Sequence, residues 1–184
     1  MVEGVGDMRG NTVVPPVVCV VGSSGAGKTT LLVKLIGELR RRGFKVGSIK
    51  HDVHGFEIDK PGKDSYRLKH AGAAVGIISS PTKVAVVMDT DHDLGLAELL
   101  PFYSGVDIVL AEGYKRENYP KVEVFRKEVH PEPLCLKDEN LVAMVTAEPM
   151  AISVPMFGPD EVSDLAGFLV EEVFQRQKKV NSRV

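Results

Sequence analysis

The stretch from Val17 to Thr30, VVCVVGSSGAGKTT, constrains the fold more than any other part of the sequence. Five apolar residues lead into a glycine-rich turn that fits the pattern GxxxxGK[ST], which is typical of a phosphate-binding loop between a buried strand and a helix. The glycines let successive backbone N–H groups point at one anion, and the helix start adds the positive end of its dipole. The pattern therefore predicts a nucleoside triphosphate site. The residues expected to hold the phosphates are Gly22, Ser23, Ser24, Gly25, Ala26, Gly27, Lys28, Thr29 and Thr30.

Two side chains at the start of the predicted helix carry specific chemistry. Lys28 is expected to reach the β- and γ-phosphates as a catalytic residue, and the Thr29 hydroxyl is expected to ligate Mg²⁺. Apolar residues then recur at helical spacing up to Leu39, and three arginines before Gly43 are typical of a helix end. A chance match in an ordinary loop is the alternative. The agreement between strand, loop, helix and stop signal favours a nucleotide site.

Composition limits the other classes of function. With 23 Lys and Arg against 25 Asp and Glu, the charge gives no electrostatic reason to expect a nucleic-acid or membrane partner. The sequence has no apolar run near the ~20 residues of a membrane span, and its first residues lack the features of a secretory signal. Cys19 and Cys135 are the only cysteines, and their spacing is not that of a metal site. These features predict a reduced, cytoplasmic protein.

The remaining patterns predict an α/β fold of the P-loop NTPase type. This is a three-layer sandwich with a mostly parallel sheet and an antiparallel hairpin. Apolar runs at 74–79 and 84–88 are joined by a short polar link, which favours the hairpin and a mixed sheet. We expect a flexible tail at 1–12, a single P-loop domain at 13–175 and a basic C-terminal tail at 176–184. Further strands are expected at 17–21, 44–49, 106–114, 121–125, 141–145 and 154–156, and helices at 28–42, 64–71, 94–100 and 159–174.

An acidic residue is expected to assist the Mg²⁺ site from the carboxyl end of a neighbouring strand. Glu112, near the end of VDIVLAEGY, is the predicted metal partner of Thr29. Asp89, which ends the run VAVVMD, is the alternative. Either carboxylate would otherwise be a charged strand end that faces water.

The polar segment 50–67, KHDVHGFEIDKPGKDSYR, follows a strand end, where loops line the ligand crevice of open α/β sheets. His51, Asp52 and His54 raise the possibility of a metal site, but no third ligand has a suitable spacing, which favours solvated histidines. Asp64 fits the N-cap of a short helix, and a functional role is the equal alternative.

Three segments together resemble one family, the molybdopterin-guanine dinucleotide biosynthesis protein B (MobB) family. They are GSSGAGKTTL (22–31), the segment 50–67 with the AGA that follows it (71–73), and EGYK (112–115). The resemblance in organisation runs from about Val17 to Phe157. The middle segment is the most specific, because other phosphate-loop proteins do not usually carry PGKDSYR at this place.

The resemblance implies a GTP-binding protein related to the nickel-insertion accessory GTPases, with Mg²⁺, slow GTP hydrolysis and a homodimer. It implies a partner, the guanylyltransferase MobA, which joins molybdopterin to GMP from GTP. The protein itself would supply nucleotide or hold molybdopterin or its guanine dinucleotide. Two alternatives stay open, a P-loop small-molecule kinase and a non-catalytic carrier of the molybdenum cofactor.

Several residues receive roles on this basis. The segment that bears Asp52, Asp59 and Asp64 is expected to close over the γ-phosphate, with Asp52 and Asp59 acting as catalytic residues. Arg67 or Lys63 is expected to contact a phosphate of the cofactor or of the neighbouring subunit's nucleotide. The sequence has no NKxD-type motif for guanine, and Glu148 in VTAEP is the candidate acceptor for the guanine N–H groups. The alternative for Glu148 is a surface-loop carboxylate.

Overall fold

The computed structural model describes residues 14–181, with the side chains described up to Val173. The chain forms two compact units. The first, here called the sheet unit, comprises the residues up to His51 and those from Leu96 onward. The second, here called the hairpin unit, is Asp52–Gly95. The predicted single domain at 13–175 stays a prediction, and the predicted tail at 1–12 lies outside the described residues.

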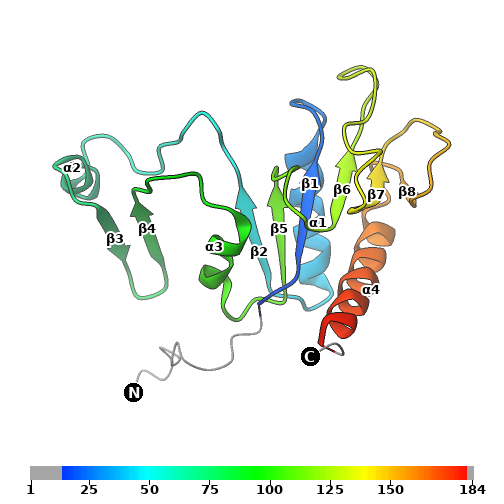
Figure 1. Cartoon of the computed structure of the whole chain (residues 1–184). Helices are drawn as coiled ribbons and strands as arrows, with labels where there is room; N and C mark the ends of the chain where they lie inside the picture. The colour runs from blue at the N-terminus through cyan, green and yellow to red at the C-terminus, as the bar shows by residue number, and fades with distance from the viewer. Residues whose placement is uncertain (1–13, 182–184) are drawn as a thin grey trace. The chain divides into compact units, whose positions relative to one another are not determined.

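The sheet unit is built on a parallel sheet whose strands are arranged in the order β2-β5-β1-β6-β7-β8 (Figure 1). All five pairings between neighbouring strands are parallel. The apolar run before the glycine-rich loop is the central strand β1, whose residues are all buried. The strands are β1 (Val17–Val21), β2 (Val46–Lys50), β5 (Ile108–Glu112), β6 (Lys121–Val124), β7 (Leu141–Val145) and β8 (Met156–Phe157).

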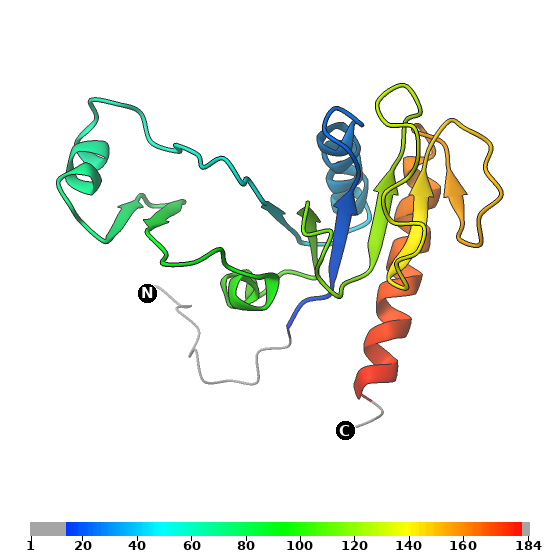
Figure 2. The same cartoon turned by 45° about the horizontal axis from the view of Figure 1, so that its top comes forward.

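Two helices, α1 (Lys28–Arg41) and α4 (Val162–Asn181), cover one face of this sheet (Figure 2). The leucines that recur at helical spacing along α1 are the residues that it buries. They join Val18 and Val20 of β1 in an apolar cluster that also includes Leu165 and Leu169 of α4. Because successive residues of a strand point to opposite faces, the other residues of β1 face the far side.

A second apolar cluster covers that far side. It contains Val17, Cys19 and Val21 of β1, together with residues of α3 (Leu96–Leu99) and the 3₁₀ helix η1 (Leu100–Tyr103). The sheet is therefore buried on both faces. The predicted three-layer α/β architecture is confirmed.

The hairpin unit contains the short helix α2 (Asp64–His70) and the antiparallel strands β3 (Val75–Ser79) and β4 (Val84–Met88). The expectation of a mixed sheet was wrong. Among the described residues, β3 and β4 pair only with each other, as a separate two-stranded sheet. The four-residue link lets each strand satisfy its backbone hydrogen bonds with its neighbour in sequence, so the hairpin closes locally.

Several element ends differ from the predicted ones. Lys63 is the N-cap of α2 and has no side-chain capping bond, so Asp64 is the first helical residue and not the cap. The predicted helix 94–100 is split into α3 and η1, because Pro101 fits the first turn of the 3₁₀ segment. The last helix begins at Val162 and continues to Asn181, past the predicted end at 174.

Candidate functional site

The glycine-rich loop leaves the carboxyl end of β1 and enters α1 in the backbone conformation that its glycines allow. Gly22, Gly25 and Gly27 have φ angles of 137°, 79° and 102°. A Cβ atom on Gly22 would collide with the backbone carbonyl oxygen of Val124 in β6. Gly22 therefore serves two needs, a positive φ angle and a close approach to the neighbouring strand.

Lys28 lies within the curl of this loop. Its ammonium group donates hydrogen bonds to the carbonyl oxygens of Gly22, at 3.0 Å, and Ser23, at 2.9 Å. The loop is closed further by a backbone hydrogen bond from Ala26 to Ser23. The positive charge is thus held at the place where the sequence pattern predicts the phosphates.

Thr29 and Glu112 meet beside the loop. The Thr29 hydroxyl donates to a carboxylate oxygen of Glu112 at 2.8 Å. Glu112 ends β5, which lies next to β1 in the sheet, and it is in register with Val20. The structure thus brings together the two predicted metal ligands, which lie far apart in the sequence. Their role in binding Mg²⁺ stays a prediction.

The alternative acid, Asp89, has a different partner. Its carboxylate forms an ion pair with Lys69 at 2.6 Å within the hairpin unit. Glu112 is therefore the carboxylate that contacts the loop threonine within the sheet unit.

Sequence reasoning missed an aromatic contact next to Glu112. Tyr114 has a φ angle of 55°, the only positive value at a non-glycine position among the described residues. Its ring lies 4.8 Å from that of His51, centroid to centroid. The backbone N–H of His51 donates to the carbonyl oxygen of Glu112 at 3.1 Å. Strained backbone of this kind clusters at functional sites, and the signal in the sequence was the tripeptide EGY.

A cavity of about 350 Å³ adjoins the loop inside the sheet unit. Ala26, Gly27 and Thr30 of the loop line it together with Phe125, which follows β6, and Glu148, which follows β7. Glu148 is half-buried, and its backbone N–H donates to the Thr146 hydroxyl at 3.0 Å. The structure therefore places the predicted guanine acceptor in one cavity with the phosphate loop.

The other predicted residues lie in the hairpin unit and have local partners. The carboxylates of Asp52 and Asp59 accept backbone N–H groups of His54 and Lys60, respectively. Arg67 lies 3.7 Å from Asp64 on α2. The proposed closing of this segment over a γ-phosphate stays a prediction. Within residues 14–181 there is no group of three or more His, Cys, Asp and Glu residues that fits a metal ion.

Two buried charged side chains anchor the loop that follows β6, and the sequence pattern did not predict their burial. Glu123, only 1% exposed, accepts the backbone N–H groups of Leu134 and Cys135 at 2.5 and 2.9 Å. Lys121, also 1% exposed, pairs with Asp138 at 2.9 Å. Charged residues in a strand usually indicate a solvated face, but here they anchor the loop that covers the second apolar cluster.

The two cysteines belong to the same cluster and are not disulfide-bonded. Burial raises the pKa of the Cys19 thiol to about 12. Burial and the nearby Glu123 carboxylate raise the pKa of Cys135 to about 11. Both thiols are therefore neutral packing groups at physiological pH.

The parallel sheet, the curled glycine loop and the threonine–carboxylate pair define a P-loop NTPase fold. Comparisons with known proteins specify the family. The family model described as "Molybdopterin guanine dinucleotide synthesis protein B" matches residues 17–147. The chain belongs to this family, MobB.

Relatives and solved structures agree with this assignment. The chain is 39% identical to the molybdopterin-guanine dinucleotide biosynthesis adapter protein of Escherichia coli, over 89% of this chain and 96% of that protein. It is 36% identical to the adapter protein of Haemophilus influenzae, over 84% of this chain and 87% of that protein. The crystal structure of Bacillus subtilis MobB has a TM-score of 0.68 and 28% identity, covering 86% of this chain and 98% of that one. No helix within residues 14–181 is long and apolar enough to cross a membrane.

Proposed function

We propose that this chain is a GTP-binding adapter in the biosynthesis of molybdopterin guanine dinucleotide. It binds GTP at the loop between β1 and α1, hydrolyses it slowly and assists a MobA-like guanylyltransferase in the cytoplasm. The observation that carries the proposal is the contact of the Thr29 hydroxyl with Glu112 beside a loop that already encloses the Lys28 ammonium. Family membership favours this accessory role over that of a small-molecule kinase.

The residues at this place fit Mg²⁺. A threonine hydroxyl and a carboxylate are hard oxygen ligands, and Mg²⁺ is usually held by one or two such groups together with water and substrate phosphates. Thr29 and Glu112 would hold the ion, which neutralises charge on the β- and γ-phosphates when bound. Lys28 exchanges its hydrogen bonds to the Gly22 and Ser23 carbonyls for phosphate oxygens, and the loop N–H groups bind the remaining phosphate oxygens.

The base would occupy the cavity that adjoins the loop. Glu148 would accept the N1 and N2 hydrogens of guanine, and Phe125, which lines the same cavity, would supply an apolar wall. Adenine carries no donor at position 1, so it would leave the carboxylate unpaired. This difference supports the choice of GTP over ATP.

Calorimetry with GTP and ATP tests the proposal. Charge-assisted hydrogen bonds contribute roughly 1.5–3 kcal/mol each, so Lys28→Ala should weaken GTP binding by at least ~10-fold. Lys45→Ala is the matched control, because Lys45 is exposed and lies just before β2. It is therefore at the amino ends of the parallel strands, whereas the loop lies at their carboxyl ends. An unchanged affinity of Lys28→Ala for GTP would refute the site. Equal binding of ATP and GTP would refute the role of Glu148.

A homodimer is part of the proposal, and the hairpin unit supplies the surface that supports it. Val75, Ile77, Val84, Val86 and Met88 alternate along β3 and β4 and are between 43% and 66% exposed. A two-stranded hairpin is marginally stable in water, and a second copy of the chain would cover this apolar face. Val86→Asp should shift the protein to monomers in sedimentation experiments. A dimer that persists in this variant would exclude this face as the interface.

A further inference from the structure

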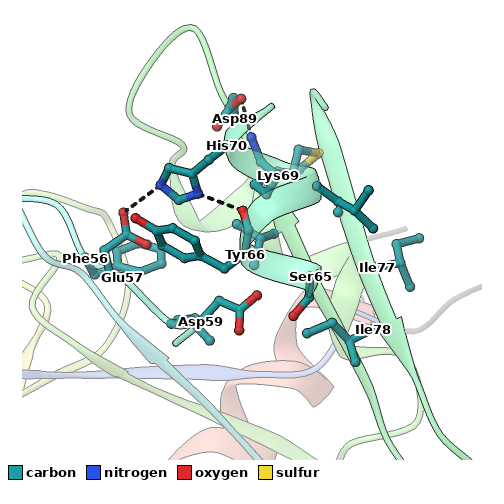
Figure 3. Close-up of a pocket in the computed structure, with 15 residues that line it drawn as sticks. Phe56, Glu57, Asp59, Ser65, Tyr66, Lys69, His70, Ile77, Ile78 and Asp89 are labelled. Atoms are coloured by element: carbon teal, nitrogen blue, oxygen red, sulfur yellow. Dashed lines mark hydrogen bonds and ion pairs between the residues drawn. The ribbon is translucent and has the colours of Figure 1, made fainter. Parts of the chain in front are cut away.

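The hairpin unit contains a cavity of about 390 Å³ that the proposed GTP site does not use (Figure 3). Residues from four stretches of the sequence line it: the segment 56–59, helix α2, strand β3, and the end of strand β4 with the Asp89 that follows it. Its volume falls within the range of small-molecule pockets. All of the residues that line it belong to the same compact unit.

An aromatic platform forms one part of this cavity. The rings of Tyr66 and His70, one turn apart on α2, stack with centroids 3.7 Å apart and planes inclined by 21°. The imidazole is fixed by a hydrogen bond of 3.0 Å between its Nδ1 and the Tyr66 carbonyl oxygen, and Glu57 lies 3.8 Å from its Nε2 (Figure 3). Phe56 also lines the cavity. Flat rings held in this way are suited to stacking against a planar ligand.

The polar groups of the cavity are mostly acceptors. Three carboxylates line it, those of Glu57, Asp59 and Asp89, against a single lysine. That lysine, Lys69, is already paired with Asp89 at 2.6 Å. A cavity with this charge repels phosphate groups and favours a ligand that presents N–H donors. It therefore differs in kind from the phosphate loop.

Asp59 is the carboxylate best placed to bind such donors. It is half-buried, and one of its oxygens accepts the Lys60 N–H at 2.8 Å. Within the described part of the chain its second oxygen has no hydrogen-bond donor and no cationic partner. An N–H pair on the edge of a planar ring would satisfy it with charge-assisted bonds.

We propose that this cavity binds the pterin ring of the molybdenum cofactor precursor, stacked on Tyr66 and hydrogen-bonded to Asp59. Pterin and guanine both carry a 2-amino-4-oxo pyrimidine edge with two adjacent N–H donors. A carboxylate such as Asp59 would recognise this edge in either ring. The pterin is the source that fits the proposed function, because guanine has its own proposed site beside the phosphate loop. The inference rests on the proposed function, and it assigns a separate site on the same chain to the second half of the dinucleotide.

Fluorescence titration of the full chain with neopterin, a soluble pterin, tests the assignment. Tyr66→Leu removes the stacking surface and should weaken neopterin binding by about 10-fold. Tyr66→Phe keeps the ring and should bind like the wild type. Asp59→Asn replaces an acceptor by an amide and should also weaken binding by about 10-fold or more. Asp91→Asn is the matched control, because Asp91 is exposed in the same unit and does not line the cavity.

The outcomes separate this inference from the proposed function. Lys28→Ala should weaken GTP binding and leave neopterin binding unchanged. Tyr66→Leu should weaken neopterin binding and leave GTP binding unchanged. The pocket assignment is overturned if the wild type does not bind neopterin, or if Tyr66→Leu and Asp59→Asn both bind it unchanged. Guanosine binding that is as tight as neopterin binding and equally sensitive to Tyr66→Leu would overturn the choice of pterin. If neopterin binds as expected while GTP does not bind, the pocket stands and the GTP proposal fails.

Discussion

Replacement of Gly22 by alanine should disrupt both the stability of the sheet unit and its phosphate loop. The new side chain would need a φ angle of 137°, which is unfavourable for an L-residue with a Cβ atom. Backbone strain of this kind costs about 1–3 kcal/mol. The Cβ atom would also collide with the carbonyl oxygen of Val124, which belongs to β6.

This collision cannot be relieved by a change of rotamer, because the group in the way is backbone. To make room, β6 would have to move away from β1, to which it is hydrogen-bonded in parallel. Overpacking in a core costs typically about 1–3 kcal/mol, so the total for Gly22→Ala is about 2–6 kcal/mol of unfolding free energy. Because the loop must shift as well, we expect GTP binding to be lost.

Urea unfolding followed by circular dichroism measures the effect. The control is Gly37→Ala in the middle of α1, where an added Cβ meets no atom within 4 Å. That variant should be more stable than the wild type by about 0.5–1 kcal/mol, because glycine is unfavourable in a helix interior. If Gly22→Ala were as stable as the wild type, the close approach of the loop to β6 would not exist as described.

Three further predictions concern the charges and thiols of the sheet unit. Hydrogen bonds from Arg41 and Arg42 hold the pKa of Glu38 at about 2, below the usual value of 4.5. The contribution of the Glu38 carboxylate to stability is therefore complete above pH 4.5 and is lost as the pH falls toward 2. Glu38→Gln should therefore lower stability at neutral pH and flatten its dependence on pH in that window, as measured by urea unfolding at a series of pH values; an unchanged acid profile would contradict this. Glu123→Gln should destabilise the protein by about 2 kcal/mol. The two carboxylate oxygens accept the Leu134 and Cys135 N–H groups separately, and in the amide one of them becomes an NH₂ group that faces a backbone donor; Glu139→Gln in the same loop should have little effect. Burial raises the pKa values of both Cys19 and Cys135, so iodoacetamide at mildly alkaline pH should leave both thiols unmodified in the folded protein. In urea it should alkylate both, as measured by mass spectrometry. Rapid modification of the native protein would contradict the burial of these thiols.

The sheet and its phosphate loop could be predicted from the sequence because local signals agree there. The apolar run specifies β1, the glycines specify the loop, and the leucines at helical spacing specify α1. The loop pattern then determines how the strand and the helix connect. Glu112 could be chosen because an acid at the end of an apolar run is a local feature. Its contact with Thr29 then follows from the pairing of β5 with β1.

Other structural features could not be predicted, because they depend on contacts between segments that are distant in the sequence. The burial of Lys121 and Glu123 in β6 depends on the loop that folds over them, so nothing in the strand's own sequence indicates that these charges are buried. The antiparallel hairpin was predicted, but its separation from the main sheet was missed, because an apolar run predicts a strand and does not say which sheet it joins.

The strand order has a consequence for synthesis of the chain. Val17 of β1 pairs with Val109 of β5, and Cys19 pairs with Lys121 of β6, so both neighbours of the central strand are made long after it. Until then the apolar segment VVCVV has no sheet to enter, although it must already be outside the ribosome. Nascent chains that end before Glu112 should therefore depend on chaperones to avoid aggregation, and those that extend beyond Val124 should be much less dependent on them.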